Sequence, residues 1–419
     1  MTETERLAKN EKIREKGKET RLKRKNQVCR VFRLKIDFSH LSKKQKTFLK
    51  MLFVEAKWLH NDVLTFAKDN DINNYDYKIK NVHVLDKDRK PVTHNIEYLG
   101  SQLKQAVIQE IKFNIKSLSA LKNNNRKIGQ LKYKSDYSSI NLTQQGITYK
   151  LCDNKRLKIQ GLKEKIKIEG TEQFFNNSDM EIANAKLLNL PDGYYLAVTT
   201  FQNKGGENKK YKSPIGIDMG IKDSITTSDR RKFKVLIEET ERLKKLQRSI
   251  AKKEKGSSNR YKTRKLLRIE CQKLTNRKLD AANKIVHELL EHEVVYMQDE
   301  NLKGWHKGLF SKVVQHSILG LVKAKLKQSG RVIVLSKQVP TTKYCPVCGN
   351  LKKDIKLSDR IYKCEVCGYS EDRDIHAARN MILLSGKNNT CGTQEINAFG
   401  EDRRRLQPAR PVEAHSSLN

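Results

Sequence analysis

The strongest constraint on the fold of this chain is a set of four cysteines near its C-terminal end. Cys345 and Cys348 form one CxxC pair, and Cys364 and Cys367 form a second pair after fifteen intervening residues. This spacing is typical of a zinc ribbon, in which each pair supplies two thiolates to one tetrahedral Zn²⁺ ion. Four thiolates leave no open coordination position, so we expect a structural zinc and look for the chemistry in other residues.

Glycine follows each pair, as Gly349 and Gly368, and permits the tight turn that a metal-binding knuckle requires. The alternatives are four unrelated core cysteines or a redox-active pair. Two pairs separated by polar sequence argue against both alternatives. The other four cysteines stand alone and are interpreted as small residues without a role; they are Cys29, Cys152, Cys271 and Cys391.

The charge of the chain predicts a large polyanion as its partner. Among 419 residues, 86 are Lys or Arg and 48 are Asp or Glu, which gives a formal net charge of +38. Because solubility requires far less charge, and because the cations recur along most of the chain, we expect nucleic acid to bind along several of roughly two to four domains. The sequence has no apolar run of about 18 residues and no signal-like N-terminus, so we expect a cytoplasmic protein without a membrane span.

The N-terminal half predicts a helical lobe inserted into a β domain. Residues 1–27 carry ten Lys or Arg, five Glu and no aromatic residue, so they form either a solvated helix or a disordered arm, with or without a role in RNA binding. From Val31, apolar and charged side chains alternate as in a half-buried strand. Ser42 and Gln45 resemble a capping box at the start of one amphipathic helix, and residues 101–121 predict a second helix.

The segment after these helices returns to β structure, with a hairpin predicted at residues 191–193. Lys and Tyr interleave at residues 132–137, which is typical of either a nucleic-acid surface or a soluble edge strand. Residues 202–212 are rich in Gly, Asn and Lys and predict a linker to the second half of the chain.

The C-terminal half has the strand and helix order of an α/β domain with insertions. Residues 214–220 predict an apolar strand around Asp218, and a buried carboxylate needs a cation or a hydrogen-bond donor as partner. Residues 242–278 contain fifteen Lys or Arg and two acidic residues, which predicts a basic helical hairpin. Since so many like charges repel one another, we favour a phosphate-binding role over a solvated face. We expect a further helix up to about residue 290 and another at residues 313–328.

Three carboxylates stand where a strand or helix could present them to a common point. Asp218 lies within its strand, Glu300 or a neighbour follows a second apolar strand at residues 294–297, and Asp374 opens a helix behind the cysteines. Such clusters hold two Mg²⁺ ions about 4 Å apart, one activating water and the other stabilising the leaving oxygen in phosphodiester hydrolysis. Isolated carboxylates at element ends are also often caps, and the spacing leaves both interpretations open.

Three short segments carry a resemblance to a known family. They are GIDMG at 216–220, QDENLKGW at 298–305 and DRDIHAARN at 372–380, with CPVCG and CEVCG before the last. Together they resemble the split RuvC nuclease and embedded zinc ribbon of the TnpB family, the transposon-encoded RNA-guided nucleases ancestral to type V CRISPR effectors. The resemblance covers about residues 215–384. More loosely, the β domain and its helical insertion resemble that family's wedge and recognition domains.

The resemblance assigns the carboxylates by motif. Asp218 corresponds to the first RuvC carboxylate and Asp374 to the third. Many members have Glu-Asp-Leu at the second motif, so a direct overlay puts Gln298 at the catalytic position. Because alternate residues of a strand share a face, Glu300 shares the face of Gln298 and can reach the metals if the strand is one step longer, so Glu300 is the predicted ligand, whereas Asp299 should face the other way. His376 replaces an Asn common in the family, and the tail from Asn388 is similar to TnpB tails.

The resemblance implies an α/β multidomain protein. Its RNase H-like (RuvC) nuclease domain carries an inserted zinc ribbon with four cysteine ligands, and an N-terminal β-barrel-like wedge domain carries a helical recognition insertion. The implied domains are a basic arm at 1–27, the wedge at 28–42 and 125–205, the recognition lobe at 43–124, the nuclease at 206–343 and 369–385 with a basic hairpin at 238–290, the ribbon at 344–368 and a disordered tail at 386–419.

The implied function is that of a transposon's RNA-guided DNA endonuclease. Mg²⁺ is implied at Asp218, Glu300 and Asp374, and Zn²⁺ at the four cysteines. The implied partners are a guide RNA and double-stranded target DNA, opened to an R-loop beside a short flanking motif, with a monomeric protein. A compact type V CRISPR effector and a nuclease-inactive guided repressor are the alternatives, and loss of a triad carboxylate would mark the repressor. A self-acting transposase is disfavoured, because the resemblance is to the guided family.

Overall fold

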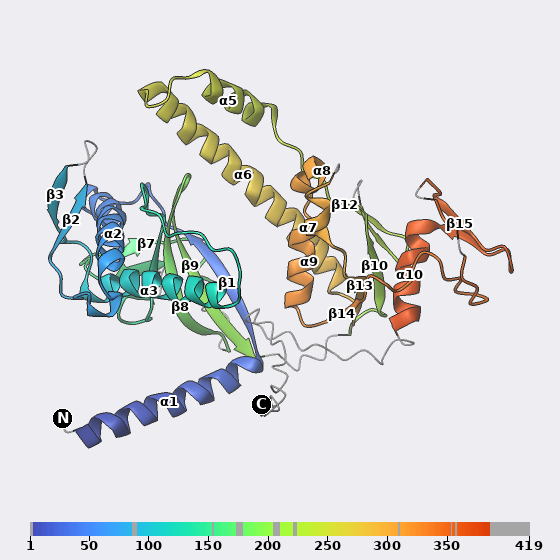
Figure 1. The fold of residues 1–419 in the computed structure, drawn as a ribbon, viewed down its shortest axis with the longest axis horizontal. Coiled ribbons are helices and arrows are strands. Elements are labelled where there is room, and N and C mark those ends of the chain that lie inside the picture. Colours follow the sequence, from blue (N-terminus) through green and yellow to red (C-terminus); the bar gives the residue numbers. More distant parts are fainter. Residues whose placement is uncertain are drawn as a thin grey trace, which may run out of the picture. The chain divides into compact units, whose positions relative to one another are not determined.

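A computed structural model describes residues 3–85, 90–152, 155–172, 179–203, 210–220, 224–308, 311–352, 354–356 and 358–385. The chain divides into two compact units, Met1–Glu207 and Asn208–Asn419 (Figure 1). Each unit has its own hydrophobic core. None of the helices in these ranges combines the length and apolar character that a membrane crossing requires. The predicted tail at 386–419, including Cys391, lies outside the described residues.

The N-terminal unit is built on a four-stranded antiparallel sheet in the order β1-β9-β8-β4. These strands are β1 (Gln27–Lys35), β4 (Ser139–Leu142), β8 (Glu181–Leu190) and β9 (Gly193–Asn203). The helices are α1 (Glu3–Lys25), α2 (Lys43–Asp69), α3 (Ser101–Asn123) and the short 3-10 helix η1 (Ile72–Asn74). Two smaller sheets complete the unit, one of β2 (Asn81–Leu85) and β3 (Pro91–Asn95), the other of β5 (Tyr149–Cys152), β6 (Arg156–Ile159) and β7 (Ile166–Lys167).

Local sequence signals of this unit are confirmed. Ser42 Oγ accepts a hydrogen bond from the backbone N–H of Gln45 at 3.2 Å, and Gln45 Oε1 accepts one from the backbone N–H of Ser42 at 2.9 Å, which completes the capping box of α2. Strands β8 and β9 form the predicted hairpin. Side chains of α2, α3 and the sheet pack into one continuous core, so the helices are held by tertiary packing as well as by their own periodicity.

Two features of this unit differ from the sequence expectation or were missed. The polar connection between α2 and α3 contains the β2–β3 hairpin. Residues 131–138 form no strand, so the edge-strand interpretation is wrong. There the hydroxyl of buried Tyr137 donates to Glu110 at 3.2 Å, and Lys134 lies over the Tyr137 ring. Tyr133 stays exposed, with the Lys68 ammonium over its ring.

The C-terminal unit is built on a five-stranded mixed sheet in the order β12-β11-β10-β13-β14. Its central strand β10 pairs antiparallel with β11 and parallel with β13, and β13 pairs parallel with β14. The strands are β10 (Ile215–Met219), β11 (Ser224–Thr227), β12 (Lys232–Lys234), β13 (Val295–Gln298) and β14 (Val332–Leu335), with a separate pair of β15 (Ile361–Lys363) and β16 (Ser370–Asp372). The helices are α5 (Glu241–Lys252), α6 (Ser258–Leu289), α7 (Leu302–Trp305), α8 (Ser311–His316), α9 (Leu319–Gln328) and α10 (Arg373–Ser385).

Two helix predictions in this unit are corrected. The second helix of the basic hairpin and the helix expected after it are one continuous helix, α6, because Ser257 caps its start and no Gly or Pro interrupts it. The helix expected at residues 313–328 is divided into α8 and α9. The backbone N–H of Ile318 donates to the carbonyl of Val235 at 2.9 Å, and this bond to another segment interrupts the helical ladder.

Strand β10 presents two different faces to its neighbours. Ile215, Ile217 and Met219 belong to the core formed with α6 and α9. Gly216 lies on the opposite face, against α10, where an added Cβ atom would lie 1.9 Å from the carbonyl oxygen of Ala378. Only glycine lets α10 approach the sheet this closely. Figure 1 shows α10 on the side of the sheet away from α9.

We expect Gly216→Ala to lower the free energy of unfolding of the C-terminal unit by about 3 kcal/mol, because a backbone atom of α10 must move away from β10. Chemical denaturation of the full chain measures this. Gly320→Ala is the matched control, since no atom lies within 4 Å of a Cβ at that position in α9, and its stability should be unchanged or slightly raised. Equal stability of the two variants would contradict the close contact.

Candidate functional site

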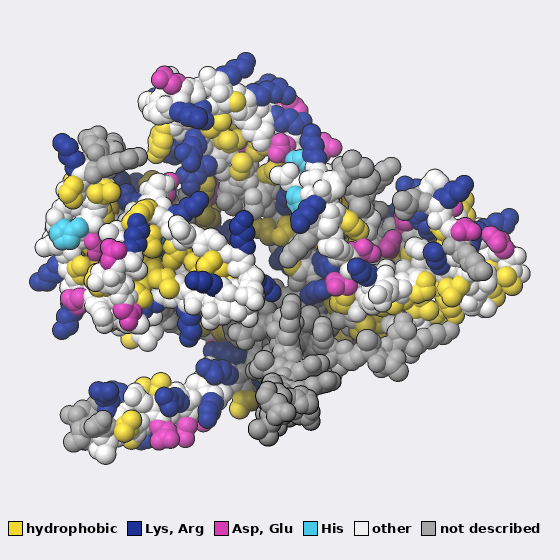
Figure 2. Space-filling view, viewed as in Figure 1, with side chains coloured by type: hydrophobic (Ala, Val, Ile, Leu, Met, Phe, Trp, Pro, Cys, Tyr) yellow, Lys and Arg dark blue, Asp and Glu magenta, His cyan; other side chains and the backbone are white. Residues whose placement is uncertain are grey.

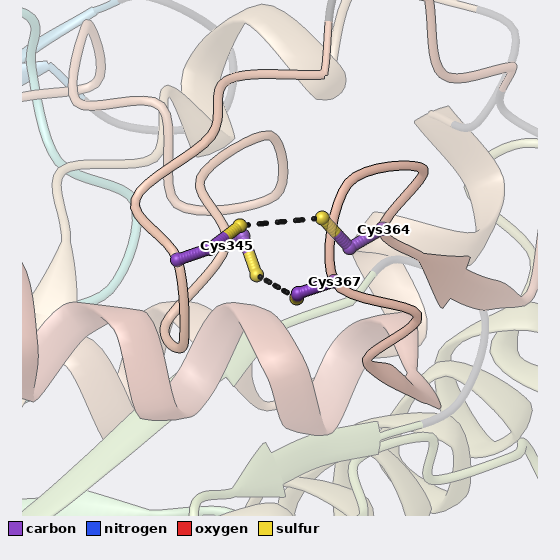
Figure 3. Close-up of side chains that lie close together, drawn as sticks. Cys345, Cys364 and Cys367 are labelled. Atoms are coloured by element: carbon purple, nitrogen blue, oxygen red, sulfur yellow. Dashed lines mark hydrogen bonds between the residues drawn. The ribbon is translucent and has the colours of Figure 1, made fainter.

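The four predicted zinc ligands converge on one point. Their Sγ atoms all lie within 4.8 Å of one another. The Sγ atoms of Cys345 and Cys367 are 3.6 Å apart, and those of Cys348 and Cys364 are 3.5 Å apart. Tetrahedral coordination with Zn–S bonds of about 2.3 Å requires about 3.8 Å between sulfurs. Figure 3 shows the thiols of Cys345, Cys364 and Cys367 pointing toward one another from two loops. The cluster therefore fits one zinc ion.

The two knuckles have the same backbone geometry. Gly349 and Gly368 adopt φ values of +74° and +73°, in the left-handed region that favours glycine. Each glycine N–H donates to the carbonyl of the first cysteine of its pair, at 3.0 and 3.2 Å. Backbone N–H groups of Cys367 and Val366 lower the pKa of Cys364, which favours the thiolate that binds zinc.

Asp218 is the centre of a second, acidic cluster. The side chain is half-buried at the end of β10, on the face that α10 covers. Burial raises the pKa of Asp218, and the negative charges of Asp374 and Glu300 raise it further, to about 7, against a lowering effect of Arg373. The structure thus brings the three predicted carboxylates into one electrostatic neighbourhood, where a cation would be favourable.

The three carboxylates are more widely spaced than the four thiols. Among His, Cys, Asp and Glu side chains in the described ranges, the cysteines alone form a group of three or more with all ligand atoms within 4.8 Å.

The close contact of α10 with β10 explains how Asp374 reaches Asp218. Asp218 is two residues beyond Gly216 and so lies on the same face of the strand. Asp374 is one helical turn before Ala378, which rests on Gly216. Asp372 caps the helix, because its Oδ1 accepts hydrogen bonds from the N–H groups of Asp374 and Ile375 at 3.0 and 3.2 Å. Helix α10 therefore carries Asp374 to the end of the strand where Asp218 lies.

The three neighbouring polar residues of the second motif, 298–300, lie in different environments. Gln298 is buried, and its Nε2 donates to the carbonyls of Ser336 and Val339 at 3.0 and 2.9 Å, so its amide is engaged in the protein interior. Strand β13 ends at Gln298, so the longer strand that the alternation argument required is not present. Asp299 pairs with Lys323 at 2.9 Å and with Lys327, both in α9. Glu300 is half-buried, and burial raises its pKa. Of the three, Glu300 is the carboxylate that contributes to the charge around Asp218.

Sequence reasoning missed the residues that link the acidic cluster to the ribbon. His376 is fully buried and stacks on Tyr362 of the ribbon with ring centroids 3.8 Å apart. Burial lowers the pKa of His376 to about 4, so the ring is neutral. Asn380, also fully buried, donates from Nδ2 to the carbonyls of Thr341 and Tyr344 at 2.7 Å each. In the sequence, the only sign of these contacts is that His376 and Asn380 are four residues apart and therefore share one face of the helix.

The basic hairpin of α5 and α6 carries many cations on its surface. Arg260 Nη1 donates to the carbonyl of Ile250 at 2.7 Å and helps to close the hairpin turn. Tyr261 is 71% exposed beside it. Figure 2 shows Lys and Arg side chains along this hairpin. Exposed members include Lys245, Arg248, Lys252, Lys262, Arg264 and Lys265. An exposed aromatic ring among cations is typical of a surface that binds phosphates and bases.

Comparisons with known proteins agree with these sites. The family described as "Probable transposase" (OrfB_IS605) matches residues 198–295, and the family "Cas12f1-like, TNB domain" matches residues 316–381. The resemblance to the TnpB family is confirmed. The two matched segments contain Asp218, Asp374 and all four cysteines, whereas β13 after Val295 and Glu300 lie between them.

Curated relatives carry matching names. A "Putative RNA-guided DNA endonuclease" of Streptomyces pristinaespiralis is 29% identical over 42% of this chain and 46% of its own length. InsQ of Escherichia coli (strain K12), described in the same words, is 23% identical over 48% and 56%. TnpB-like protein L79 of Acanthamoeba polyphaga mimivirus is 28% identical over 46% and 41%. The chain thus spans about half the length of the curated relatives it matches.

Two solved structures show a weak likeness. One is the cryo-EM structure of a Cas12f1-sgRNA-target DNA complex, 16% identical with a TM-score of 0.26, covering 84% of this chain and 98% of that chain. The other is the mini-RNA-guided endonuclease CRISPR-Cas_phi3, 9% identical with a TM-score of 0.36, covering 86% and 93%.

We expect purified protein to contain one zinc ion per chain by elemental analysis. Cys364→Ser should lower both the zinc content and the yield of folded protein, because ribbon folding is coupled to metal binding. Cys271→Ser is the control, since Cys271 is an exposed cysteine on α6 far along the chain from the ribbon, and it should change neither quantity. Zinc content well below one per chain in the parent would contradict the four-thiolate site.

Proposed function

We propose that the protein is a transposon's RNA-guided DNA endonuclease of the TnpB type, which cuts DNA by phosphodiester hydrolysis in a RuvC-like site. The observation that carries the proposal is the shared electrostatic neighbourhood of Asp218, Glu300 and Asp374 at the carboxyl ends of β10 and β13. Ligands of α/β sheets commonly bind at that edge. The sheet order β12-β11-β10-β13-β14, three antiparallel strands followed by two parallel ones, supports an RNase H-like nuclease domain.

The proposed site would hold Mg²⁺ with carboxylate oxygens, the donors that this hard cation prefers. Two bound ions would activate water and stabilise the leaving oxygen. The chain's own residues orient these carboxylates. Lys323 Nζ donates to the backbone carbonyl of Glu300 at 2.6 Å and so fixes the loop after β13. Arg373 Nε lies 3.7 Å from Asp374 Oδ1 and adds positive charge beside the cluster.

The proposed partners are a guide RNA and a double-stranded DNA target that opens to an R-loop. Support comes from the net charge of +38 and from the exposed cations of the basic hairpin. For the N-terminal unit we propose a wedge-like role of residues 28–42 and 125–205 and a recognition role of residues 43–124. Helix α1 is anchored to the sheet of this unit through Arg24, whose guanidinium lies 3.7 Å from the Phe201 ring centroid and binds Glu181 at 2.6 Å.

The carboxylate assignment gives a sharp test. Asp218→Asn, Glu300→Gln and Asp374→Asn should each lower Mg²⁺-dependent cleavage of guided DNA by orders of magnitude while leaving RNA and target binding intact, because each removes a charge and hardly changes shape. Asp299→Asn is the neighbouring control and should keep appreciable activity, since Asp299 pairs with the lysines of α9. Cleavage rates and binding constants are measured on the same preparations, with the RNA that copurifies identified by sequencing.

Three results would change the proposal. An inactive Asp299→Asn beside an active Glu300→Gln would show that Asp299 is the second ligand. Guided binding without cutting by the parent under any divalent ion would favour the nuclease-inactive repressor. Guide RNA transcribed from a CRISPR array would favour the compact type V effector.

The basic hairpin predicts a steep salt dependence of RNA binding. Each phosphate contact contributes about −0.7 to −0.9 to the slope of log K against log salt concentration. Replacing Lys245, Arg248 and Lys252 by Gln should therefore make the slope shallower by about two units. Lys155→Gln is the control, because Lys155 pairs with Glu172 in the N-terminal unit, and its effect should be below one unit. Filter-binding titrations over a salt series give both slopes, and an unchanged slope for the triple variant would exclude the hairpin as a phosphate-binding surface.

A further inference from the structure

Two buried amides connect the zinc ribbon to the elements that carry the carboxylates. One is Gln298, the last residue of β13, and the other is Asn380 in α10. Both hold the same stretch of backbone, residues 336–344, which we call the connector. The connector leads from β14 to the first zinc ligand, Cys345. Each amide is therefore bonded to a segment that ends at a predicted zinc ligand.

The contacts of Gln298 fix the first part of the connector. Its Nε2 donates to the carbonyls of Ser336 and Val339, and its Oε1 accepts from the hydroxyl of Thr341 at 3.3 Å. Gln298 is 8% exposed and Thr341 is 4% exposed, so these bonds form in the protein interior. Glu300 lies two residues beyond Gln298. A displacement of the connector would therefore also displace the segment that carries the Glu300 carboxylate.

The contacts of Asn380 fix the second part of the connector. Its Nδ2 donates to the carbonyls of Thr341 and Tyr344, and Tyr344 immediately precedes Cys345. The other end of the ribbon continues without a loop from β16 into α10, which begins at Arg373 and carries Asp374 in its first turn. His376 stacks on Tyr362 between these two connections. The ribbon is thus fastened to α10 at both of its ends.

We propose that Gln298 and Asn380 are positioning residues, which together act as a clamp through which the zinc-bound ribbon sets the positions of Glu300 and Asp374. This inference rests on the proposed function of the acidic cluster. Zinc binding orders the ribbon, and the hydrogen bonds of the connector then hold β13 and α10 in place. The zinc ion then supports a second metal site in which it takes no chemical part. Buried groups that orient metal-binding side chains commonly change metal affinity or activity by about 10- to 100-fold when they are replaced.

The test uses the full chain and three variants. Gln298→Met removes all three amide hydrogen bonds and nearly keeps the volume. Asn380→Asp keeps the shape but replaces the Nδ2 donor by an oxygen, which faces the two carbonyl oxygens that Nδ2 had bonded. Gln45→Met is the matched control, because Gln45 is also a buried amide that bonds to backbone, in the capping box of α2 in the other unit. Circular dichroism selects a temperature at which every variant is folded.

Two measurements on the folded proteins are independent of cleavage. Mn²⁺ serves as a probe of the acidic cluster, and its binding is followed by the paramagnetic resonance signal of the free ion. Zinc release to a colorimetric chelator reports the order of the ribbon. We expect both clamp variants to weaken Mn²⁺ binding by about tenfold and to release zinc faster than the parent. We expect the double variant to bind Mn²⁺ as well as the single variant that binds it less tightly, because the two residues act through the same connector. Gln45→Met should lower stability without changing either quantity.

Cleavage provides the third measurement and separates this inference from the proposed function. For a cleaving parent, the clamp variants should need about tenfold more Mg²⁺ for half-maximal rate and should recover most of the rate at saturating Mg²⁺. A parent that does not cleave would refute the proposed function, and the Mn²⁺ and zinc measurements would still decide on the clamp. Folded clamp variants that match the parent in Mn²⁺ binding and zinc release would overturn the inference, because a purely stabilising role changes only the unfolding transition.

Discussion

The close packing of α10 on β10 is the contact on which the C-terminal unit depends. At Gly216 the two backbones approach so closely that a single Cβ would overlap the carbonyl oxygen of Ala378. This contact fixes the distance and the rotation of α10 relative to the strand. Because Asp374 is one turn from Ala378 and Asp218 is two residues from Gly216, the same contact determines where the two carboxylates lie. Gly216 therefore helps to position the carboxylates of Asp218 and Asp374.

Charge and burial distinguish two carboxylates that are adjacent in the chain. Asp299 points to α9, where Lys323 and Lys327 neutralise it. Burial raises the pKa of Glu300, and the negative charge of Asp299 raises it further, against a lowering effect of Lys323. Strand β13 ends at Gln298, and the backbone N–H of Glu300 donates to the carbonyl of Gln298 at 3.0 Å, so the two carboxylates lie in the turn after the strand. Gln298, the last residue of the strand, is buried, and its amide bonds the connector.

Much of the site follows from the sequence because its signals are local. The CxxC spacing defines four ligands, since each knuckle closes over only a few residues. Likewise, the capping box of α2 and the apolar strand around Asp218 depend on neighbours in the chain. Local periodicity also predicted the basic hairpin, although α6 continues farther than expected because no residue within it favours an end.

Long-range contacts decided the rest. The division between α8 and α9 arises from a backbone bond between Ile318 and Val235, which are distant in sequence. Lys134 and Tyr137 resemble a nucleic-acid surface in sequence, yet they pack around Glu110 of α3. The hydrogen-bond partners of Asn380 and the close contact of Ala378 with Gly216 were also not predictable from the sequence. A pattern of residues specifies which groups a segment offers, whereas only the folded chain specifies which distant groups come within bonding distance, because those distances depend on how all the elements pack.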